Sequence, residues 1–420
     1  MRLQRRQLLA AGGMIAGAAY TGLARAAVQQ AQNLKPIKLP PPIGRPERIE
    51  RLARARALMR ANDIGAILVE PGASLDYFTG VQWWRSERLT AAVIPAEGDP
   101  LIVTPFFEKP SVEESLGVKA EVRTWNEDEE PLKVVADFLR ERGLAGARIG
   151  MEETNRFFIL DRLNRQLPSG RVVSANPVVR GCRMIKTAPE IALMQAASDI
   201  TLAAFAHTSP RLEAGMTPAD IDAMIGEATR ALGGSYDGGL VLLGEGTAYP
   251  HGTHKPQTVE RGTNVLFDCG CDVHGYKSDI SRSFVWGADP TPEQRKVWMQ
   301  MRRGQDIAFA AAKLGAPAGS VDDAVRSAYE SWGYGPGYKL PGTSHRTGHG
   351  IGMEGHEPVN LVHGEMTPLA PGMCFSNEPG IYLPGKFGIR LEDCFHMTVS
   401  GPKWFSVPPA SLEEPIGGNA

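Results

Sequence analysis

The segment from Asn264 to Trp286 constrains the chain more than any other, because it predicts a β-hairpin with acidic residues inside it. Apolar residues at 265–267 predict one strand, and the alternating pattern at 280–285 predicts a second. The residues at 272–275 form a turn signal between them. We therefore expect two antiparallel strands joined by a tight turn.

Two aspartates occupy notable positions in this hairpin. A turn centred between Val273 and His274 would place Asp268 directly opposite Asp279. Carboxylates on facing cross-strand positions repel each other, and a fold tolerates such a pair where a cation lies between them. The alternative is that one aspartate points to solvent, or that the strands pair in another register. The hairpin is thus the first indication of a metal site.

Length and charge limit the classes of protein to which the chain can belong. Its 420 residues exceed one ordinary hydrophobic core, so two domains are expected. A hydrophobic content of 42%, a charged content of 22% and a net charge of -2 fit a soluble globular protein and give no sign of nucleic-acid binding. After the first thirty residues, no apolar run is long enough to cross a membrane.

The cysteine count is odd, so at least one thiol is free. Cys269 and Cys271 share one face of the predicted strand, and neighbours at this spacing form a disulfide poorly. A thiolate metal site is the alternative, but the nearby carboxylates and histidines already make a complete ligand set. We expect small buried side chains at all five positions: Cys182, Cys269, Cys271, Cys374 and Cys394.

Residues 1–26 resemble an export signal. A cationic start with Arg5 and Arg6 precedes a Gly- and Ala-rich stretch and an Ala-Arg-Ala cleavage pattern at 24–26. The run after Gln4 resembles a twin-arginine signal, although a Ser or Thr usually precedes the arginine pair. An ordinary secretory signal or an uncleaved anchor is the alternative. We expect the twin-arginine route, which exports folded enzymes, and a periplasmic protein that has no membrane contact after signal removal.

The rest of the chain divides into two predicted domains. A Pro-rich linker at 27–45 precedes strands that alternate with helices at 46–176, a pattern typical of an α/β domain. Within this domain, residues 75–80 are expected to form a turn. The second domain is expected at 177–405, followed by a C-terminal tail at 406–420.

The second domain contains clear helix starts and a faint repeat. Thr217 is expected to cap a helix with Asp220 as its partner, and Thr291 opens another helix in the same way. The segments that begin at Leu212 and Leu314 are weakly alike. This likeness hints that the domain arose by internal duplication.

Histidines and buried-looking acids gather towards the C-terminus. His345, His349 and His356 fall within twelve residues and are separated by glycines, which indicates a site that backbone must approach closely. A single histidine is more often a structural residue. Glu378 ends one apolar run and Glu392 lies inside another, and acids in such places are commonly buried or functional.

Taken together, these residues resemble the pita-bread metallopeptidases, which include methionine aminopeptidase, prolidase and aminopeptidase P. The spacing of the two aspartates, the GHGIG motif, the EPG motif and the R-x-E-D motif at 390–393 all match the family. Residues 46–170 resemble the creatinase-type N-terminal domain of prolidase and aminopeptidase P. The residues that carry the resemblance are Asp268, Asp279, His349, Glu378 and Glu392.

The resemblance implies a fold and a metal site. The fold would be an α/β creatinase-like domain followed by an α+β pita-bread catalytic domain with pseudo-two-fold duplication. Asp268 would bind one metal ion, Asp279 and Glu392 would bridge two ions, and His349 and Glu378 would complete the ligands of the second. Four carboxylates and one imidazole form a hard, oxygen-rich site that favours Mn²⁺, with Zn²⁺, Co²⁺ or Fe²⁺ as alternatives.

The resemblance also implies catalytic roles. Glu378 would relay a proton to the leaving amine, while His356 and His251 would bind the substrate carbonyl and its developing negative charge. Trp84 would reach the site from the N-terminal domain of its own or a neighbouring subunit, or else pack between the domains. Other residues expected near the substrate or the metal ligands are His345, Tyr382 and Arg390.

The function implied is removal of the first residue from peptides with proline second, by an Xaa-Pro aminopeptidase or an Xaa-Pro dipeptidase. Such an enzyme would take peptides as its partners and form a homodimer or a higher homo-oligomer. Three alternatives stay open: a metal-dependent lyase on the same fold, such as a dimethylsulfoniopropionate lyase, another C–N hydrolase, and a non-catalytic binding protein. An intact set of metal ligands favours the peptidase.

Overall fold

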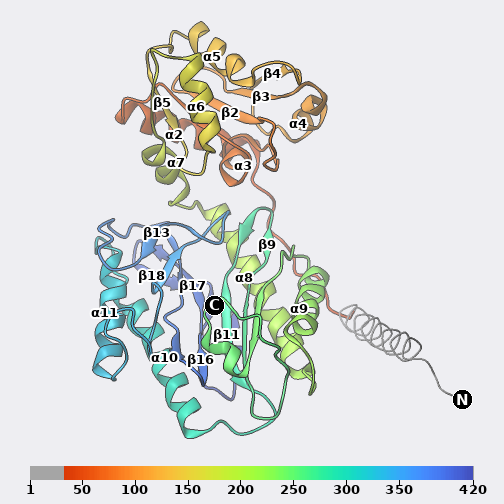
Figure 1. Ribbon diagram of the computed structural model, residues 1–420, viewed down its shortest axis with the longest axis vertical. Coiled ribbons are helices and arrows are strands. Elements are labelled where there is room, and N and C mark those ends of the chain that lie inside the picture. Colours follow the sequence, from red (N-terminus) through yellow and green to blue (C-terminus); the bar gives the residue numbers. More distant parts are fainter. Residues whose placement is uncertain (1–32, 420) are drawn as a thin grey trace, which may run out of the picture. The chain divides into compact units, whose positions relative to one another are not determined.

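The computed structural model, shown in Figure 1, describes residues 33–419. The expected export signal at 1–26 lies outside the described residues. Two compact units are present: one spans Pro42–Ile185, and the other begins at Lys186 and includes the segment before Pro42. That segment is tied to its unit where Ile37 N donates to Leu232 O at 2.9 Å. Among the described helices, none is long and apolar enough to cross a membrane.

The N-terminal unit, Pro42–Ile185, is an α/β domain built on one six-stranded sheet. Its strands are β1 (Ala66–Val69), β2 (Ala91–Pro95), β3 (Leu101–Pro105), β4 (Glu121–Trp125), β5 (Arg148–Met151) and β6 (Arg171–Ser174). Its helices are α2 (Arg45–Ala61), α3 (Ala73–Thr79), α4 (Lys109–Ser115), α5 (Pro131–Glu141), α6 (Phe157–Gln166) and α7 (Asn176–Arg183). The strand order is β4-β3-β2-β1-β5-β6, and the sheet is mixed, since β1 and β2 are antiparallel whereas β1 and β5 are parallel.

Two details of this unit differ from the sequence-based expectation. The segment 75–80 was expected to be a turn, whereas α3 runs through Ala73–Thr79 and ends at Gly80, whose φ of 84° makes a left-handed cap. Helix α7 packs against α2, so the compact unit extends to Ile185 rather than to residue 176.

The C-terminal unit contains two helix pairs and several antiparallel sheets. Its helices are α8 (Ala188–Thr208), α9 (Pro218–Leu232), α10 (Pro292–Ala311) and α11 (Gly319–Ser331). Its longer strands are β7 (Leu240–Leu243), β8 (Asn264–Cys269), β11 (Ile280–Val285), β13 (Glu357–Leu361), β14 (Cys374–Asn377), β17 (Asp393–Thr398) and β18 (Gly401–Trp404). Its shorter strands are β9 (Asp272–Val273), β10 (Tyr276–Lys277), β12 (Gly348–Gly350), β15 (Ile381–Leu383), β16 (Phe387–Ile389), β19 (Ser406–Val407) and β20 (Gly418–Asn419).

This unit is a duplication of one arrangement, a helix pair followed by an antiparallel sheet. The pair α8–α9 precedes the sheet β11-β8-β7, and the pair α10–α11 precedes the sheet β13-β12-β14-β17-β18. Figure 1 shows the strands lying between the two helix pairs. The predicted capping boxes at Thr217 and Thr291 open α9 and α10. The two sheets meet at an antiparallel bridge between Ser281 and Glu392.

The predicted hairpin is present, but its register differs from the expected one. Asp268 pairs with Ser281 rather than with Asp279, and Tyr276 pairs with Val273. The turn therefore falls at His274 and Gly275, whose φ angles are 52° and 87°. Two central residues with positive φ are the hallmark of a tight type I′ hairpin turn. Because the shift is by two positions, both aspartates keep the same face of the hairpin.

The C-terminal residues are part of the fold and not a separate tail. Strand β19 pairs with β20, and the Ser406 hydroxyl donates to the buried carboxylate of Asp393. Arg282 Nε donates to Ile416 O at 2.7 Å, which holds the last segment against the hairpin. The expected boundary at residue 405 therefore cuts through this unit.

Candidate metal centre

The structure brings the five predicted ligands together at the junction of the two sheets. Asp268 lies in β8, one residue before its end, and His349 lies in β12. Asp279 precedes β11, Glu378 follows β14 and Glu392 precedes β17. Together with His356, they form three groups whose ligand atoms lie within 4.8 Å of one another: Asp268 with Asp279 and Glu392, His349 with Glu378 and Glu392, and Asp279 with His349 and His356. Asp279, His349 and Glu392 each belong to two groups, so the groups form one continuous cluster.

Hydrogen bonds fix the orientation of His349 within the cluster. Its backbone N donates to Ser376 Oγ at 3.0 Å, and its ring Nδ1 donates to Gly350 O at 3.1 Å. The remaining ring nitrogen, Nε2, lies 3.2 Å from Glu378 Oε1 and 3.8 Å from Asp279 Oδ2. A histidine whose Nδ1 is held by a carbonyl presents Nε2 to a metal in the orientation typical of protein ligands.

The acids of the cluster crowd one another electrostatically. Burial and the neighbouring charge of Asp268 raise the pKa of Asp279 to about 7. Burial and the charge of Asp279 likewise raise the pKa of Glu392 well above its usual range. Burial opposes ionisation of Glu378, yet the hydrogen bond with His349 and nearby positive charges lower its pKa to about 2. The raised pKa values of Asp279 and Glu392 show that the neighbouring positive side chains do not fully compensate the negative charges of the clustered carboxylates.

These residues fit a divalent cation. Glu392 is only 2% exposed, so its oxygens are shielded from water. One of them, Oε1, has no hydrogen-bond partner among the described residues. Its other oxygen accepts from Ser281 Oγ at 2.8 Å. A buried carboxylate oxygen without a partner is costly, and a bound cation beside it would remove that cost.

Arg390 forms hydrogen bonds with Asp268 and with three residues close to it in the fold. Its NH2 group donates to Asp268 Oδ2, and its Nε donates to Ser281 Oγ at 3.1 Å. Its NH1 group donates to Tyr382 OH at 3.0 Å and to Pro250 O at 3.0 Å. Arg390 therefore contacts Asp268 directly, and the same side chain anchors the loop that carries His251.

His345 and Tyr382 continue this network. Tyr382 OH lies 2.8 Å from His345 Nε2, and His345 Nδ1 donates to Arg346 O at 2.8 Å. Since both ring nitrogens of His345 have partners, neither is available to bind a metal in this arrangement. His345 Nδ1 also lies 4.0 Å from Glu378 Oε2, so the ring sits at the edge of the cluster.

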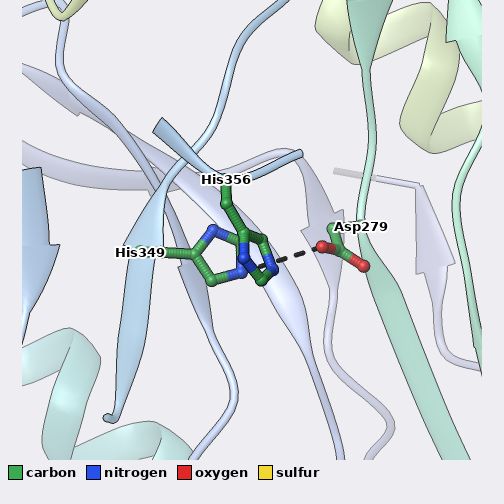
Figure 2. A group of neighbouring side chains, drawn as sticks. All are labelled: Asp279, His349 and His356. Carbon is green, nitrogen blue, oxygen red and sulfur yellow. Dashed lines mark ion pairs between the residues drawn. The ribbon is translucent and has the colours of Figure 1, made fainter. Parts of the chain in front are cut away.

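His356 lies beside His349, and Figure 2 shows the two rings next to each other near the Asp279 carboxylate. Arg346 NH2 lies 3.1 Å from His356 Nδ1, and a guanidinium can only donate. Nδ1 must therefore accept, so the neutral ring carries its proton on Nε2. Burial and the positive charges of His349 and Arg346 lower the pKa of His356 to about 4, which keeps the ring neutral at pH 7. A neutral ring with a proton on Nε2 is a hydrogen-bond donor and not a metal ligand.

Two predicted residues remain: His251, which lies outside the three groups, and Trp84, which belongs to the other compact unit. His251 is exposed and belongs to none of the three groups, although Arg390 binds the carbonyl of the preceding Pro250. It lines a separate cavity of about 540 Å³ together with Leu240 and Leu242. Trp84 belongs to the N-terminal unit, where it stacks on Trp83 and is 69% exposed.

The sequence analysis did not predict two residues of the centre, Ser281 and Ser376. Ser281 links Asp268 and Glu392 at 3.0 and 2.8 Å, and Ser376 accepts from the backbone of His349. The alternating pattern of β11 placed Ser281 on the same face as Asp279, which was the only available signal. The cysteine expectation is confirmed, since all five thiols are free and buried.

The comparisons with known proteins agree with this geometry. Residues 192–399 match the model of metallopeptidase family M24, and residues 51–185 match the creatinase/prolidase N-terminal domain. A probable dipeptidase PepE of Mycobacterium tuberculosis is 33% identical over 357 residues, which cover 84% of this chain and 92% of the relative. The chain belongs to metallopeptidase family M24. It is therefore a peptidase with metal-dependent chemistry, and its clustered carboxylates and histidines are able to hold metal.

Other relatives share this architecture. A Xaa-Pro dipeptidase of Lactobacillus helveticus is 32% identical over 358 residues, 82% of this chain and 93% of the relative. Among solved structures, dipeptidase PepE from Mycobacterium ulcerans matches with a TM-score of 0.80 and 32% identity, covering 89% of this chain and 99% of that one. The prolidase from Thermococcus sibiricus matches with a TM-score of 0.77 and 28% identity, covering 85% and 96%. These likenesses confirm the creatinase-like and pita-bread fold expected from the sequence.

Proposed function

We propose that this M24 peptidase is an Xaa-Pro dipeptidase that works with two divalent metal ions. The observation that carries the proposal is that two carboxylates are shared between groups of candidate ligands. Asp279 and Glu392 each belong to two of the three groups. A carboxylate with neighbours on both sides suits a bridging position between two ions. The donor set is rich in oxygen, so Mn²⁺ is the ion we expect.

The relatives support the choice of substrate. The Lactobacillus helveticus relative is named a Xaa-Pro dipeptidase and the Thermococcus sibiricus relative a prolidase. A second candidate, Xaa-Pro aminopeptidase, is supported by the X-Pro aminopeptidase of Thermotoga maritima, which matches with a TM-score of 0.75 and 27% identity over 86% of this chain and 98% of that one. Both candidates cleave after the first residue and differ in how far the substrate extends beyond proline.

The chain's own residues can be assigned to the steps of hydrolysis. When bound, the ions would supply Lewis acidity and lower the pKa of water at the site. Glu378 is the acid best placed to carry a proton from the attacking water to the leaving nitrogen. One of its carboxylate oxygens lies beside the His349 ring and the other faces the His345 ring. His356 would donate its Nε2 proton to the carbonyl oxygen as negative charge develops there. His251 is assigned to the same carbonyl, carried by the loop that Arg390 anchors.

Purified protein loaded with Mn²⁺ provides the test of substrate class. We expect Gly-Pro to be cleaved faster than Gly-Pro-Pro, and Gly-Ala to be cleaved at least about tenfold more slowly than Gly-Pro, as pocket selection of this kind allows. Product formation by amine detection gives kcat/KM for each peptide. Preference for Gly-Pro-Pro would favour the aminopeptidase, and equal rates on Gly-Pro and Gly-Ala would refute the proline requirement.

We also propose that the mature protein is periplasmic and assembles as a homodimer or a higher homo-oligomer. The first proposal rests on residues 1–26, and the second on what the family resemblance of the sequence motifs implies. Light scattering of the purified protein measures the assembly, and a monomer at assay concentration would exclude an oligomer as the active form.

The route of export has its own expected result. Changing both Arg5 and Arg6 to lysine should leave the precursor in the cytoplasm, because the twin-arginine route depends on the arginine pair. Fractionation of cells followed by immunoblotting measures the distribution. A double variant that reaches the periplasm at the normal rate would assign the protein to the general secretory route.

A further inference from the structure

A cavity of about 250 Å³ opens beside the cluster of candidate metal ligands, within the C-terminal unit. Asp268 and Asp279 form one of its walls, so the cavity is continuous with the site. Its other walls come from the segment around Asp237 and from residues of the β8–β11 hairpin. Since a water molecule occupies about 30 Å³ in the liquid, the cavity has room for a long side chain.

Close backbone packing and side-chain hydrogen bonds hold the walls of the cavity. Gly270 lies so close to the hairpin's other strand that a Cβ there would meet Ser278 O at 2.0 Å. On the opposite side, the Asp222 carboxylate accepts from Tyr236 OH and, at 3.0 Å, from Gly239 N. These bonds clamp the segment that carries Asp237, so the cavity is a preformed feature of the fold.

The lining is polar and carries a net negative charge. Among the described residues, those that line the cavity include no aliphatic or aromatic side chain. Lys277 Nζ lies 3.3 Å from Asp237 Oδ2 and 3.4 Å from Asp272 Oδ2. Two carboxylates thus share one ammonium group, while the charges of Asp268 and Asp279 belong to the metal cluster.

A peptide substrate would carry its first side chain beside its free α-ammonium group. A peptidase that removes one residue recognises the free α-ammonium, and carboxylates at the cluster are its natural partners. The side chain leaves the same carbon atom as the ammonium. A substrate whose scissile carbonyl oxygen met His356 would therefore carry its first side chain near the wall formed by Asp268 and Asp279, which the cavity shares with the cluster.

Asp272 and Asp237 differ in how firmly they are held. Asp272 also accepts from Gly275 N at 2.7 Å through its other oxygen, which fixes it in the hairpin turn. The Asp237 side chain is 79% exposed, and among the described residues it forms an ion pair with Lys277. Asp237 is therefore the carboxylate best placed to meet an incoming cation at the mouth of the cavity.

We propose that this cavity binds the side chain of the substrate's first residue and selects a cationic one, lysine or arginine, through Asp237. The proposal rests on the peptidase function proposed above and adds a substrate class to it. Lys277 sets the strength of the selection, because it compensates part of the negative charge.

The test compares Lys-Pro, Leu-Pro and Glu-Pro, with Gly-Pro as the reference. In the wild-type protein, kcat/KM should fall in the order Lys-Pro, Leu-Pro, Glu-Pro. Asp237→Asn should lower the Lys-Pro to Glu-Pro ratio by about two- to fivefold, the range for one partly exposed ion pair, mainly through KM. Lys277→Met should raise that ratio. Added salt should reduce it in the wild-type protein, because exposed charges are screened.

Asp289→Asn is the matched control, since it makes the same charge change at an exposed position outside the cavity. It should leave the ratio unchanged. If Asp237→Asn slows all dipeptides equally, or if Leu-Pro is the best wild-type substrate, the proposed selection is wrong while the peptidase function stands. If Gly-Pro itself is not cleaved, the proposed function falls and this inference falls with it.

Discussion

Replacing Asp279 by alanine should remove both metal binding and peptide cleavage. Asp279 is grouped with Asp268 and Glu392 and also with His349, so its loss would remove a donor that both proposed ions share. Metal content, measured by elemental analysis, should fall from about two ions per chain, as in two-metal hydrolases, to well below one. Turnover of Gly-Pro should fall to the background rate.

The same variant separates a metal ligand from a structural residue. In the metal-free protein, burial and Asp268 disfavour the charged form of Asp279, so removing this carboxylate should leave the melting temperature unchanged or raise it. Added Mn²⁺ should raise the melting temperature of the wild-type protein, because a ligand that binds only the folded state stabilises it. That rise should disappear in the variant.

Asp289→Ala is the control, because Asp289 is an exposed acid that belongs to none of the ligand groups. It should keep metal content, turnover and the Mn²⁺-dependent rise in melting temperature. Wild-type protein that cleaves Gly-Pro at full rate without any transition metal would refute the metal-dependent mechanism. Full activity in Asp279→Ala would exclude a bridging role for this carboxylate.

The hairpin illustrates what the sequence could and could not predict. The apolar and alternating runs specified both strands and the shared face of the two aspartates. They did not specify the register, because a two-residue turn at His274 and Gly275 depends on two positive φ angles. Asp268 consequently faces Ser281, and this serine joins two acids that the sequence separates widely.

The clustered residues and Arg390 were predictable because each lies in a local motif, whereas the contacts that orient the cluster were not. Arg390 contacts Pro250 O and Asp268 across long stretches of chain, and no local pattern signals such pairings. The proton position on His356 likewise depends on Arg346, which the sequence analysis did not single out. Short motifs therefore identify the chemistry, and the folded chain decides how each group is used.

The domain ends were misplaced for a related reason. The sequence analysis placed the boundaries at 176 and 405. Packing decides otherwise: α7 joins the N-terminal unit, and Ser406 binds Asp393, whose carboxylate forms a fully buried ion pair with Arg282. Boundaries depend on contacts between distant segments, which composition does not encode.

Replacing His356 by alanine should lower kcat by about 10²–10³-fold, the cost of losing one hydrogen-bond donor to a developing oxyanion. The donor matters more in the transition state than in the ground state, so KM should change little. Both metal ions should stay bound, because Arg346 occupies Nδ1 and leaves a proton on Nε2.

His363→Ala provides the matched control, since His363 is an exposed histidine paired with Asp323 and lies in none of the ligand groups. It should keep kcat, metal content and melting temperature near wild-type values. The rival role for His356 is structural, and it predicts a lowered melting temperature with normal turnover in the folded fraction. Metal content, melting temperature and kcat measured on one preparation distinguish the two roles. A normal kcat in His356→Ala would remove this residue from catalysis, and a loss of metal would make it a ligand instead of a donor.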